Sequence, residues 1–166
     1  MADLNELVNL EGHLHITGLN NLDVAQASTA NLWNKLGIQK LTLEWSELTN
    51  FNQSLCDPQG NAVSCMSDSQ QPGISATADQ VLKCLKPHSN LEELSIKGYN
   101  GSFSSSWLGW LPLDRLASIE LKDCHNCKEV PPLGCLPSLK HILIQSLPKR
   151  EANWSRVLWQ CWRYHF

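Results

Sequence analysis

The feature that most constrains this chain is a short apolar segment that returns five times at nearly constant spacing. In each copy, two aliphatic side chains flank one central residue. The five copies are Leu14-His15-Ile16, Leu41-Thr42-Leu43, Leu94-Ser95-Ile96, Ile119-Glu120-Leu121 and Ile142-Leu143-Ile144. Four of them carry a further apolar residue three places upstream, namely Ile38, Leu91, Leu116 and Leu139. The first residues of neighbouring copies are separated by 27 positions (14 to 41), 25 (94 to 119) and 23 (119 to 142), but the step from 41 to 94 is 53.

The pattern L-x-x-L-x-L is the core of a leucine-rich repeat, whose period is about 20 to 29 residues. Alternation places the two aliphatic side chains on one face of a short strand, and stacked units bury that face in a continuous core. We therefore predict an α/β fold: a leucine-rich repeat solenoid with a short parallel sheet on its concave side and helices or loops on its convex side. The alternative is that the five segments are ordinary strands of an α/β domain. The long step holds either a degenerate repeat or an insertion.

The segments between the strands predict two helices and one long loop. We expect a helix of about three turns within residues 23–36, ended by Gly37. A second helix is expected over residues 78–86, with Thr77 and Gln80 as a capping box and Pro87 at its end. Residues 46–76 are polar and carry Pro and Gly, so we expect an insertion loop there. The leucine-rich repeat solenoid is then expected to span residues 1–148. Residues 149–166 form a tail without the repeat pattern, either a helix that covers the open end of the solenoid or a non-native extension.

Composition and charge exclude several classes of protein. The formal net charge of −3 gives no basic field for nucleic acid. No run of about 18 apolar residues exists, so we expect no membrane-spanning helix. The N-terminus shows no basic segment followed by an unbroken apolar run, so no secretory signal is visible. An odd count of seven cysteines without such a signal fits reduced thiols, so we expect a cytoplasmic protein.

The sequence lacks the motifs that carry common chemistry. It contains no G-x-x-x-x-G-K-[ST], G-x-G-x-x-G, H-E-x-x-H or G-x-S-x-G, so we predict that the protein is not an enzyme and uses no cofactor. Cys124 and Cys127 have the spacing of a zinc pair, with Cys135 and His141 further along the chain. Cys124 also occupies the position where leucine-rich repeats place Asn or Cys after the strand, so we predict a structural cysteine and no metal.

We expect the binding surface on the concave side of the sheet. The side chains between and beside the buried pairs point there by alternation. These candidates are His15, Thr17, Thr42, Glu44, Ser95, Lys97, Glu120, Lys122, Leu143 and Gln145. Lys97 and Lys122 hold equivalent places in neighbouring repeats, which predicts contact with an acidic patch. A mixed-charge surface of this kind can also be merely solvated. Trp107 and Trp110 are either a binding pair or core residues, and we favour the core.

Three stretches resemble one known family. They are the run from Leu10 to Leu22 with Leu41-Thr42-Leu43-Glu44-Trp45 after it, the segment from Val81 to Gly101, and Cys124-His125-Asn126-Cys127 followed by residues 130–140. Together they resemble the leucine-rich repeat region of plant intracellular immune receptors, the coiled-coil, nucleotide-binding, leucine-rich repeat disease resistance proteins. The resemblance covers about residues 4–148. Three serines lie between Phe103 and Trp107, where the family usually carries a proline.

The resemblance implies a protein-recognition module in the defence response to pathogens. Its implied partners are a pathogen effector, a guarded host protein or the receptor's own nucleotide-binding domain. The nucleotide-binding and N-terminal signalling domains of the family are missing from these 166 residues. The chain is therefore expected to be a fragment or truncated product. The alternative function is a structural or regulatory fragment with no independent activity; an extracellular receptor ectodomain fits less well.

Overall fold

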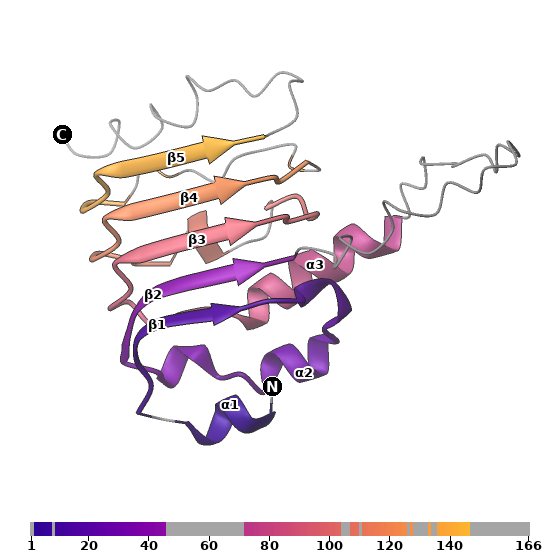
Figure 1. The fold of residues 1–166 in the computed structure, drawn as a ribbon, viewed down its shortest axis with the longest axis horizontal. Helices are drawn as coiled ribbons and strands as arrows, with labels where there is room; N and C mark the ends of the chain where they lie inside the picture. Colours follow the sequence, from indigo (N-terminus) through magenta and orange to yellow (C-terminus); the bar gives the residue numbers. More distant parts are fainter. Residues whose placement is uncertain are drawn as a thin grey trace, which may run out of the picture.

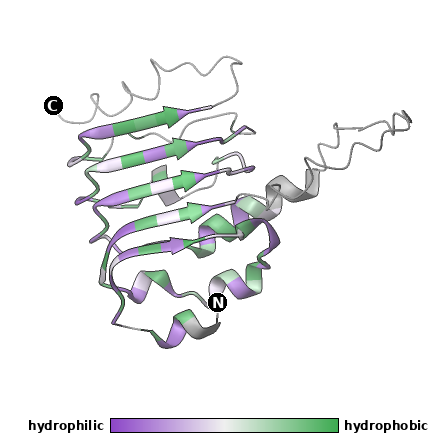
Figure 2. Cartoon of the chain, in the orientation of Figure 1, coloured by the Kyte–Doolittle hydropathy of each residue, from purple (hydrophilic) through white to green (hydrophobic). Residues whose placement is uncertain are grey.

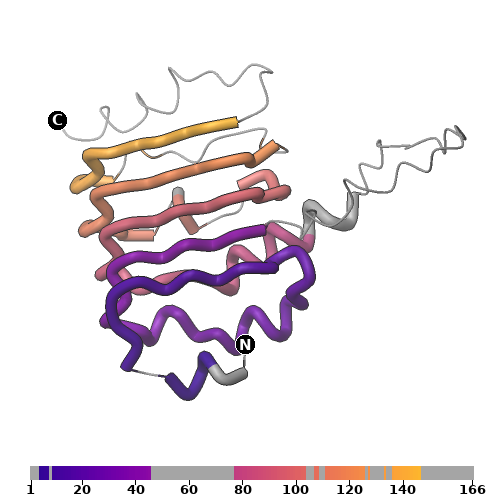
Figure 3. The backbone as a smooth tube through the Cα atoms, viewed as in Figure 1, coloured from indigo at the N-terminus to yellow at the C-terminus, as the bar shows by residue number. Residues whose placement is uncertain are grey.

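The fold is a five-stranded parallel sheet whose strands lie side by side in chain order (Figure 1). The computed structural model describes residues 2–7, 9–45, 72–103, 107–109, 111–125, 127, 133 and 136–146. The strands are β1 (Glu11–Ile16), β2 (Gly37–Glu44), β3 (Glu93–Lys97), β4 (Ser118–Lys122) and β5 (His141–Gln145). Each of the five apolar segments lies inside one strand, so the predicted parallel sheet of an α/β repeat fold is confirmed. Figure 3 shows the return path from the end of β1 to the start of β2.

The register aligns equivalent residues of the repeats across the sheet. Leu41 pairs with Leu14 on one side and Leu94 on the other, and Leu94 pairs with Ile119, which pairs with Ile142. The ladder continues one residue beyond the strands, where the Gly98 amide donates to the Lys122 carbonyl at 2.8 Å. Because β2 pairs directly with β3, the 53-residue step adds no strand between them. The described part of the step contains helix α3 (Pro72–Cys84), and the insertion and the degenerate repeat both stay predictions.

One irregularity interrupts the register at the start of β1. The pairing shifts between Gly12 and His13, so that Gln39 of β2 is the extra residue. Gly12 has φ +78°, a conformation that is strained for a residue with a Cβ atom. The extra residue lies in β2, and a bulge bends the strand that carries it and increases its twist.

The inward side chains form the core, with exceptions at both ends of the sheet. Leu41, Leu43, Leu94 and Ile96 are buried, as are Ile119 and Leu121. Apolar and polar residues alternate along β3 and β4 in Figure 2, whereas the middle of β5 is apolar throughout. Three predicted core residues are less covered: Leu14 and Ile144 are half-buried, and Ile142 is 41% exposed. The reason is position, because β1 and β5 each have a neighbouring strand on one side only in the described sheet.

The first predicted helix is much shorter than three turns. Only α2 (Val24–Ser28) is an α-helix, and a 3-10 turn follows at Leu32–Asn34. Asn31 lies between them with φ +48°, in the left-handed region that ends a right-handed helix. Ala27, Ala30 and Leu32 are nevertheless buried. Gly37 does not cap a helix as predicted, because it begins β2.

The second predicted helix starts earlier than expected. Helix α3 spans Pro72–Cys84, so Thr77 lies in its interior and the predicted capping box is wrong. Residues 72–76 of the expected loop therefore belong to this helix, while residues 46–71 lie outside the described residues. Proline is favoured in the first turn of a helix because the N–H groups there have no intrahelical acceptor, so the lack of an N–H group in proline costs no hydrogen bond.

Helix α3 packs behind the β1–β2 end of the sheet, beside α2 (Figure 1). Ala78, Val81, Leu82 and Leu85 form its buried face. The Trp107 indole Nε1 donates to the Leu82 carbonyl at 2.7 Å, and Trp107 is buried, so its predicted place in the core is confirmed. Trp110 lies outside the described residues, as does the tail over residues 149–166.

A buried lysine fixes the N-terminal segment. Its helix α1 spans Ala2–Glu6, and the Lys35 ammonium donates to the carbonyl oxygens of Leu4 at 2.5 Å and Leu7 at 2.8 Å. Cations near a helix C-terminus satisfy carbonyls that have no intrahelical partner. Lys35 is 1% exposed, and its burial lowers the pKa of the ammonium below the ordinary lysine value. Among the described helices, none has the length and apolar character needed to cross a membrane.

A charge placed in the inward columns should unfold the repeat stack. Leu94→Asp or Leu121→Asp would bury an unpaired carboxylate, and each should lower the free energy of unfolding by at least about 3 kcal/mol. Circular dichroism during thermal and urea unfolding measures this loss. Gln145→Asp is the control, because Gln145 lies exposed on the other side of the sheet and its replacement should leave stability nearly unchanged. A wild-type melting temperature in either leucine variant would contradict the inward assignment.

Candidate functional site

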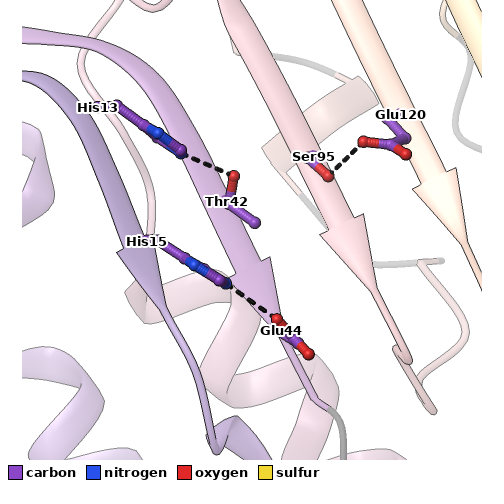
Figure 4. Close-up of polar contacts among 6 residues, drawn as sticks. All are labelled: His13, His15, Thr42, Glu44, Ser95 and Glu120. Carbon is purple, nitrogen blue, oxygen red and sulfur yellow. Dashed lines mark hydrogen bonds and ion pairs between the residues drawn. The ribbon is translucent and has the colours of Figure 1, made fainter.

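The candidate site is the side of the sheet opposite the core, which we call the open face. Its side chains alternate with the buried columns along each strand. The members are His13, His15, Lys40, Thr42, Glu44, Glu93, Ser95, Lys97, Ser118, Glu120, Lys122, His141, Leu143 and Gln145. Figure 4 shows six of them on one side of the strands.

The register arranges the open face in three rows that run across the strands. The first row is His13, Lys40, Glu93, Ser118 and His141. The second row is His15, Thr42, Ser95, Glu120 and Leu143. The third row is Glu44, Lys97, Lys122 and Gln145. Since neighbouring strands lie about 4.8 Å apart, side chains within one row are close enough to act together on a partner.

Two histidines organise the β1 end of the open face. His13 Nε2 lies 3.0 Å from Thr42 Oγ1, and His15 Nε2 lies 2.9 Å from Glu44 Oε2 (Figure 4). The two imidazole rings are nearly parallel, with an interplanar angle of 7° and centroids 6.3 Å apart. Both contacts reach diagonally to the next row on β2. They hold this end of the face in one arrangement before any partner binds.

The middle of the open face is also internally paired. Ser95 Oγ donates to Glu120 Oε2 at 2.8 Å across β3 and β4 (Figure 4). Lys40 Nζ lies 2.8 Å from Glu93 Oε1, with both side chains half exposed. Such exposed ion pairs contribute between about zero and 1 kcal/mol, so this pair sets the local charge pattern more than the stability.

The third row leaves two positive charges next to each other. Lys97 of β3 and Lys122 of β4 are register partners, and both are half-buried. Within the described part of the chain, neither forms an ion pair. Like charges directly opposite one another on neighbouring strands repel. An anionic group from a partner would relieve that repulsion. The lysine pair is therefore the place on the open face where positive charge is most concentrated.

The residues that the sequence predicts for binding differ in their exposure to solvent. His15, Thr17, Leu143 and Gln145 are exposed, with Thr17 just beyond the end of β1. The half-buried members are Glu44, Ser95, Lys97, Glu120 and Lys122. Thr42 is buried beneath its contact with His13, so it offers a partner little surface.

Sequence analysis missed the first row of the open face. Only residues between and after the apolar pairs were predicted to bind. The first row consists of the residues that precede those pairs: His13, Lys40, Glu93, Ser118 and His141. The signal was available, because alternation extended one step upstream of each apolar pair reaches all five positions.

The two cysteines of the C-x-x-C pair belong to the core. Cys124 and Cys127 are buried, and the Cys124 thiol donates to the Lys122 carbonyl at 3.4 Å. The Cys127 thiol donates to the Gly101 carbonyl at 3.6 Å. Hydrogen bonding with Cys124 and burial both raise the pKa of the Cys127 thiol, which opposes thiolate formation. The predicted structural role of Cys124 in the turn is confirmed.

The described residues do not gather a metal site around this pair. His141 is exposed on the open face of β5, whereas Cys124 lies in the core, and Cys135 is outside the described residues. No group of three or more His, Cys, Asp or Glu side chains in the described ranges could hold a metal ion.

A carboxylate at the back of the sheet holds α3 to the turn after β3. Asp79 accepts hydrogen bonds from the Tyr99 hydroxyl and from the Ser102 amide at 3.0 Å, and the Ser102 hydroxyl donates to its other oxygen at 2.8 Å. Burial and the hydrogen bond to Asp79 raise the pKa of Tyr99. A Cβ atom at Gly101 would lie 2.5 Å from Asp79 Oδ1, so only glycine fits there. This network is far from the open face and serves the fold.

The sequence comparisons agree with the repeat geometry. The family profile described as R13L1/DRL21 LRRs matches residues 1–147. The chain belongs to this leucine-rich repeat family. Its curated relatives include a disease resistance protein of Arabidopsis thaliana (32% identical over 146 residues, 87% of this chain) and disease resistance RPP13-like protein 1 of the same plant (28% over 148 residues, 89%). Disease resistance protein RGA4 of Solanum bulbocastanum is 30% identical over 146 residues, 86% of this chain.

The chain spans only a small part of the length of these relatives. The matched segment spans 9% of the first Arabidopsis protein and 13% of the other two. No solved structure matches the chain.

Metal removal provides a test of the cysteine assignment. EDTA or 1,10-phenanthroline should leave the melting temperature unchanged, because the Cys124 and Cys127 thiols bond to backbone carbonyls. Cys124→Ala should instead lower the free energy of unfolding by about 1–2 kcal/mol, because it leaves a cavity in the core. Thermal unfolding with and without chelator measures both effects. Chelator-induced unfolding that zinc reverses would show that the thiols are metal ligands.

Proposed function

We propose that this R13L1/DRL21 repeat segment is a protein-recognition module of a plant intracellular immune receptor. The observation that carries the proposal is the open face, an aligned polar surface on which Lys97 and Lys122 lie side by side in the third row. Its relatives are named as disease resistance proteins, which supports a role in the defence response. The proposed activity is binding, with no catalytic step and no cofactor.

The proposed architecture around the site is a solenoid. Five strands in chain order, each joined to the next by a return segment behind the sheet, have the connectivity of stacked repeats. In such a stack the sheet lines the concave side, and the open face becomes the inner surface of the curve. Extended concave surfaces of this kind suit the recognition of another protein. The proposed location is the cytoplasm.

The chemistry of the third row favours an acidic partner surface. Lys97 and Lys122 would face carboxylates of the partner, while Glu44 at one end of the row and Gln145 at the other would limit the acidic patch to the width of two strands. Three partners fit this description: a pathogen effector, a guarded host protein and the receptor's own nucleotide-binding domain. A partner of the last kind would make the contact autoinhibitory.

A second candidate function is a structural or regulatory segment without activity of its own. The small share of each relative that the chain spans supports it. Pull-down of defence proteins, including the nucleotide-binding domain of a relative such as RGA4, separates the two candidates. Specific capture by the isolated chain supports recognition, and no capture supports the second candidate.

Charge reversal at the lysine pair tests the proposed contact. Lys97→Glu combined with Lys122→Glu should slow association with a captured partner at least about tenfold at low salt, because steering by charge acts mainly on the association rate. The dependence of that rate on ionic strength should flatten. Biolayer interferometry at several salt concentrations measures both quantities.

The matched control reverses two charges away from the open face. Lys83→Glu with Arg115→Glu makes the same change in net charge, and both side chains are exposed. Its association rate should stay near that of the wild type. Unchanged kinetics in the Lys97/Lys122 variant, or an equal effect in the control, would contradict a specific contact by the lysine pair.

A further inference from the structure

Two cysteines lie at the two ends of the turn that follows β4. The Cys127 amide donates to the Cys124 carbonyl at 3.3 Å, which is the hydrogen bond that closes a four-residue turn. Such a turn keeps its first and last Cα atoms within about 7 Å of each other. A disulfide needs a Cα separation of about 4.4–6.8 Å. The backbone of this turn therefore already holds the two cysteines near the separation that a disulfide requires.

The two side chains also lie next to each other. Both are free thiols, and they form a hydrogen bond with one another. A hydrogen bond between two thiols requires their sulfur atoms to be neighbours. A bond between Cys124 Sγ and Cys127 Sγ can thus form by a local adjustment of one turn, without a change in the strand order.

The two thiols differ in acidity. The hydrogen bond with Cys127 lowers the pKa of the Cys124 thiol, although burial opposes this change. The same hydrogen bond, together with burial, raises the pKa of the Cys127 thiol. Cys127 is therefore the proton donor of the pair, and Cys124 is the sulfur that ionises first. Oxidation begins at a thiolate, and a second thiol beside it completes a disulfide.

The turn reaches the surface although its sulfur atoms face the core. His125, which follows Cys124, is exposed. Cys124 is 0% exposed and Cys127 is 6% exposed. Opening of this single turn is enough to admit a molecule as small as hydrogen peroxide. Burial should make the reaction slow, so the pair should stay reduced until peroxide accumulates.

We propose that Cys124 and Cys127 form a reversible oxidation site, at which hydrogen peroxide converts the two thiols into one disulfide inside the turn. The Cys124 thiolate attacks the peroxide, breaks its O–O bond and becomes a sulfenic acid, while the released hydroxide takes up a proton to form water. The Cys127 sulfur then attacks the Cys124 sulfur and displaces a second water, which carries away the thiol proton. In total the thiols lose two electrons and two protons, and one peroxide is reduced to two waters. This modification is independent of the proposed recognition function.

Oxidation would remove hydrogen bonds at two neighbouring turns. The Cys124 thiol donates to the Lys122 carbonyl and the Cys127 thiol donates to the Gly101 carbonyl, whereas a disulfide has no proton to donate. The Lys122 carbonyl keeps the hydrogen bond from the Gly98 amide. The Gly101 carbonyl, in the turn after β3, loses its thiol donor. We therefore expect oxidation after β4 to loosen the turn after β3.

Peptide mapping of the full 166-residue chain tests the proposal, because one tryptic peptide contains this pair and no other cysteine. Trypsin cuts after Lys122 and Lys128 and releases residues 123–128. The folded chain is treated with hydrogen peroxide, and its remaining thiols are then labelled with N-ethylmaleimide in denaturant. After peroxide, the peptide should carry no label and weigh two hydrogen atoms less than its reduced form. Dithiothreitol before labelling should restore the doubly labelled peptide.

Serine variants separate the roles of the two sulfur atoms. Cys127→Ser keeps a hydrogen-bond donor beside Cys124, so a sulfenic acid should accumulate on Cys124 and react with dimedone. Cys124→Ser leaves only the less acidic thiol, so its dimedone adduct should be at least about tenfold less abundant. Cys84→Ser is the matched control, because Cys84 lies in α3, and the 123–128 peptide should be oxidised in this variant as in the wild type.

The mapping of the wild-type chain requires no variant, so it decides the proposal even if a serine variant fails to fold. A 123–128 peptide that keeps both labels at peroxide concentrations that oxidise Cys84 would overturn the proposal. A disulfide that joins this peptide to another one would overturn pairing inside the turn. Equal dimedone labelling of the Cys124→Ser and Cys127→Ser variants would overturn the assignment of Cys124 as the attacking sulfur. Hydrogen–deuterium exchange over residues 98–103 should be faster in the oxidised chain, and unchanged exchange would overturn the coupling between the two turns.

Discussion

The shared register of the five parallel strands is the constraint on which the other features depend. Leu41 pairs with Leu94, and Leu43 pairs with Ile96, so the inward side chains of successive repeats stack into continuous buried columns. A single unit has too little apolar surface to cover its own face, and each unit completes the core of its neighbours. The same register aligns the polar side chains on the other side of the sheet into rows. The order of the open face therefore follows from the packing of the core.

Two polar side chains behind the sheet connect segments that lie between the strands. Lys35 holds the carbonyl end of α1, and Asp79 holds the turn after β3 to α3. Each of these groups is satisfied by hydrogen bonds, which offsets the cost of removing it from water. The lysine pair of the open face differs from both, because Lys97 and Lys122 are neighbours that carry the same charge. The polar groups of Lys35 and Asp79 are therefore satisfied behind the sheet, whereas the two lysines leave a concentration of positive charge on the surface.

The strands could be predicted from the sequence, but the helices could not. A two-residue alternation repeated at a fixed period specifies strand position strongly, because each copy supports the others. Helix boundaries depend on single positions. Asn31 adopts a left-handed conformation that stops a helix, and Pro72 starts α3 six residues before the predicted first residue at position 78. Local capping signals such as Thr77 and Gln80 were outweighed by the packing of Ala78, Val81 and Leu82 on the sheet.

The sequence by itself determined the strand positions, the inward leucine columns, the structural role of Cys124 and the family, because all four follow from residue type at a fixed spacing. Tertiary structure decided what spacing cannot encode. The pairing of β1 with β2 shifts at Gln39, and the contact with His13 covers Thr42. The place of β5 at the edge of the sheet exposed Ile142, although its pattern matches that of buried Ile119. Each of these outcomes depends on which strand lies alongside, and that neighbour is set only when the whole sheet assembles.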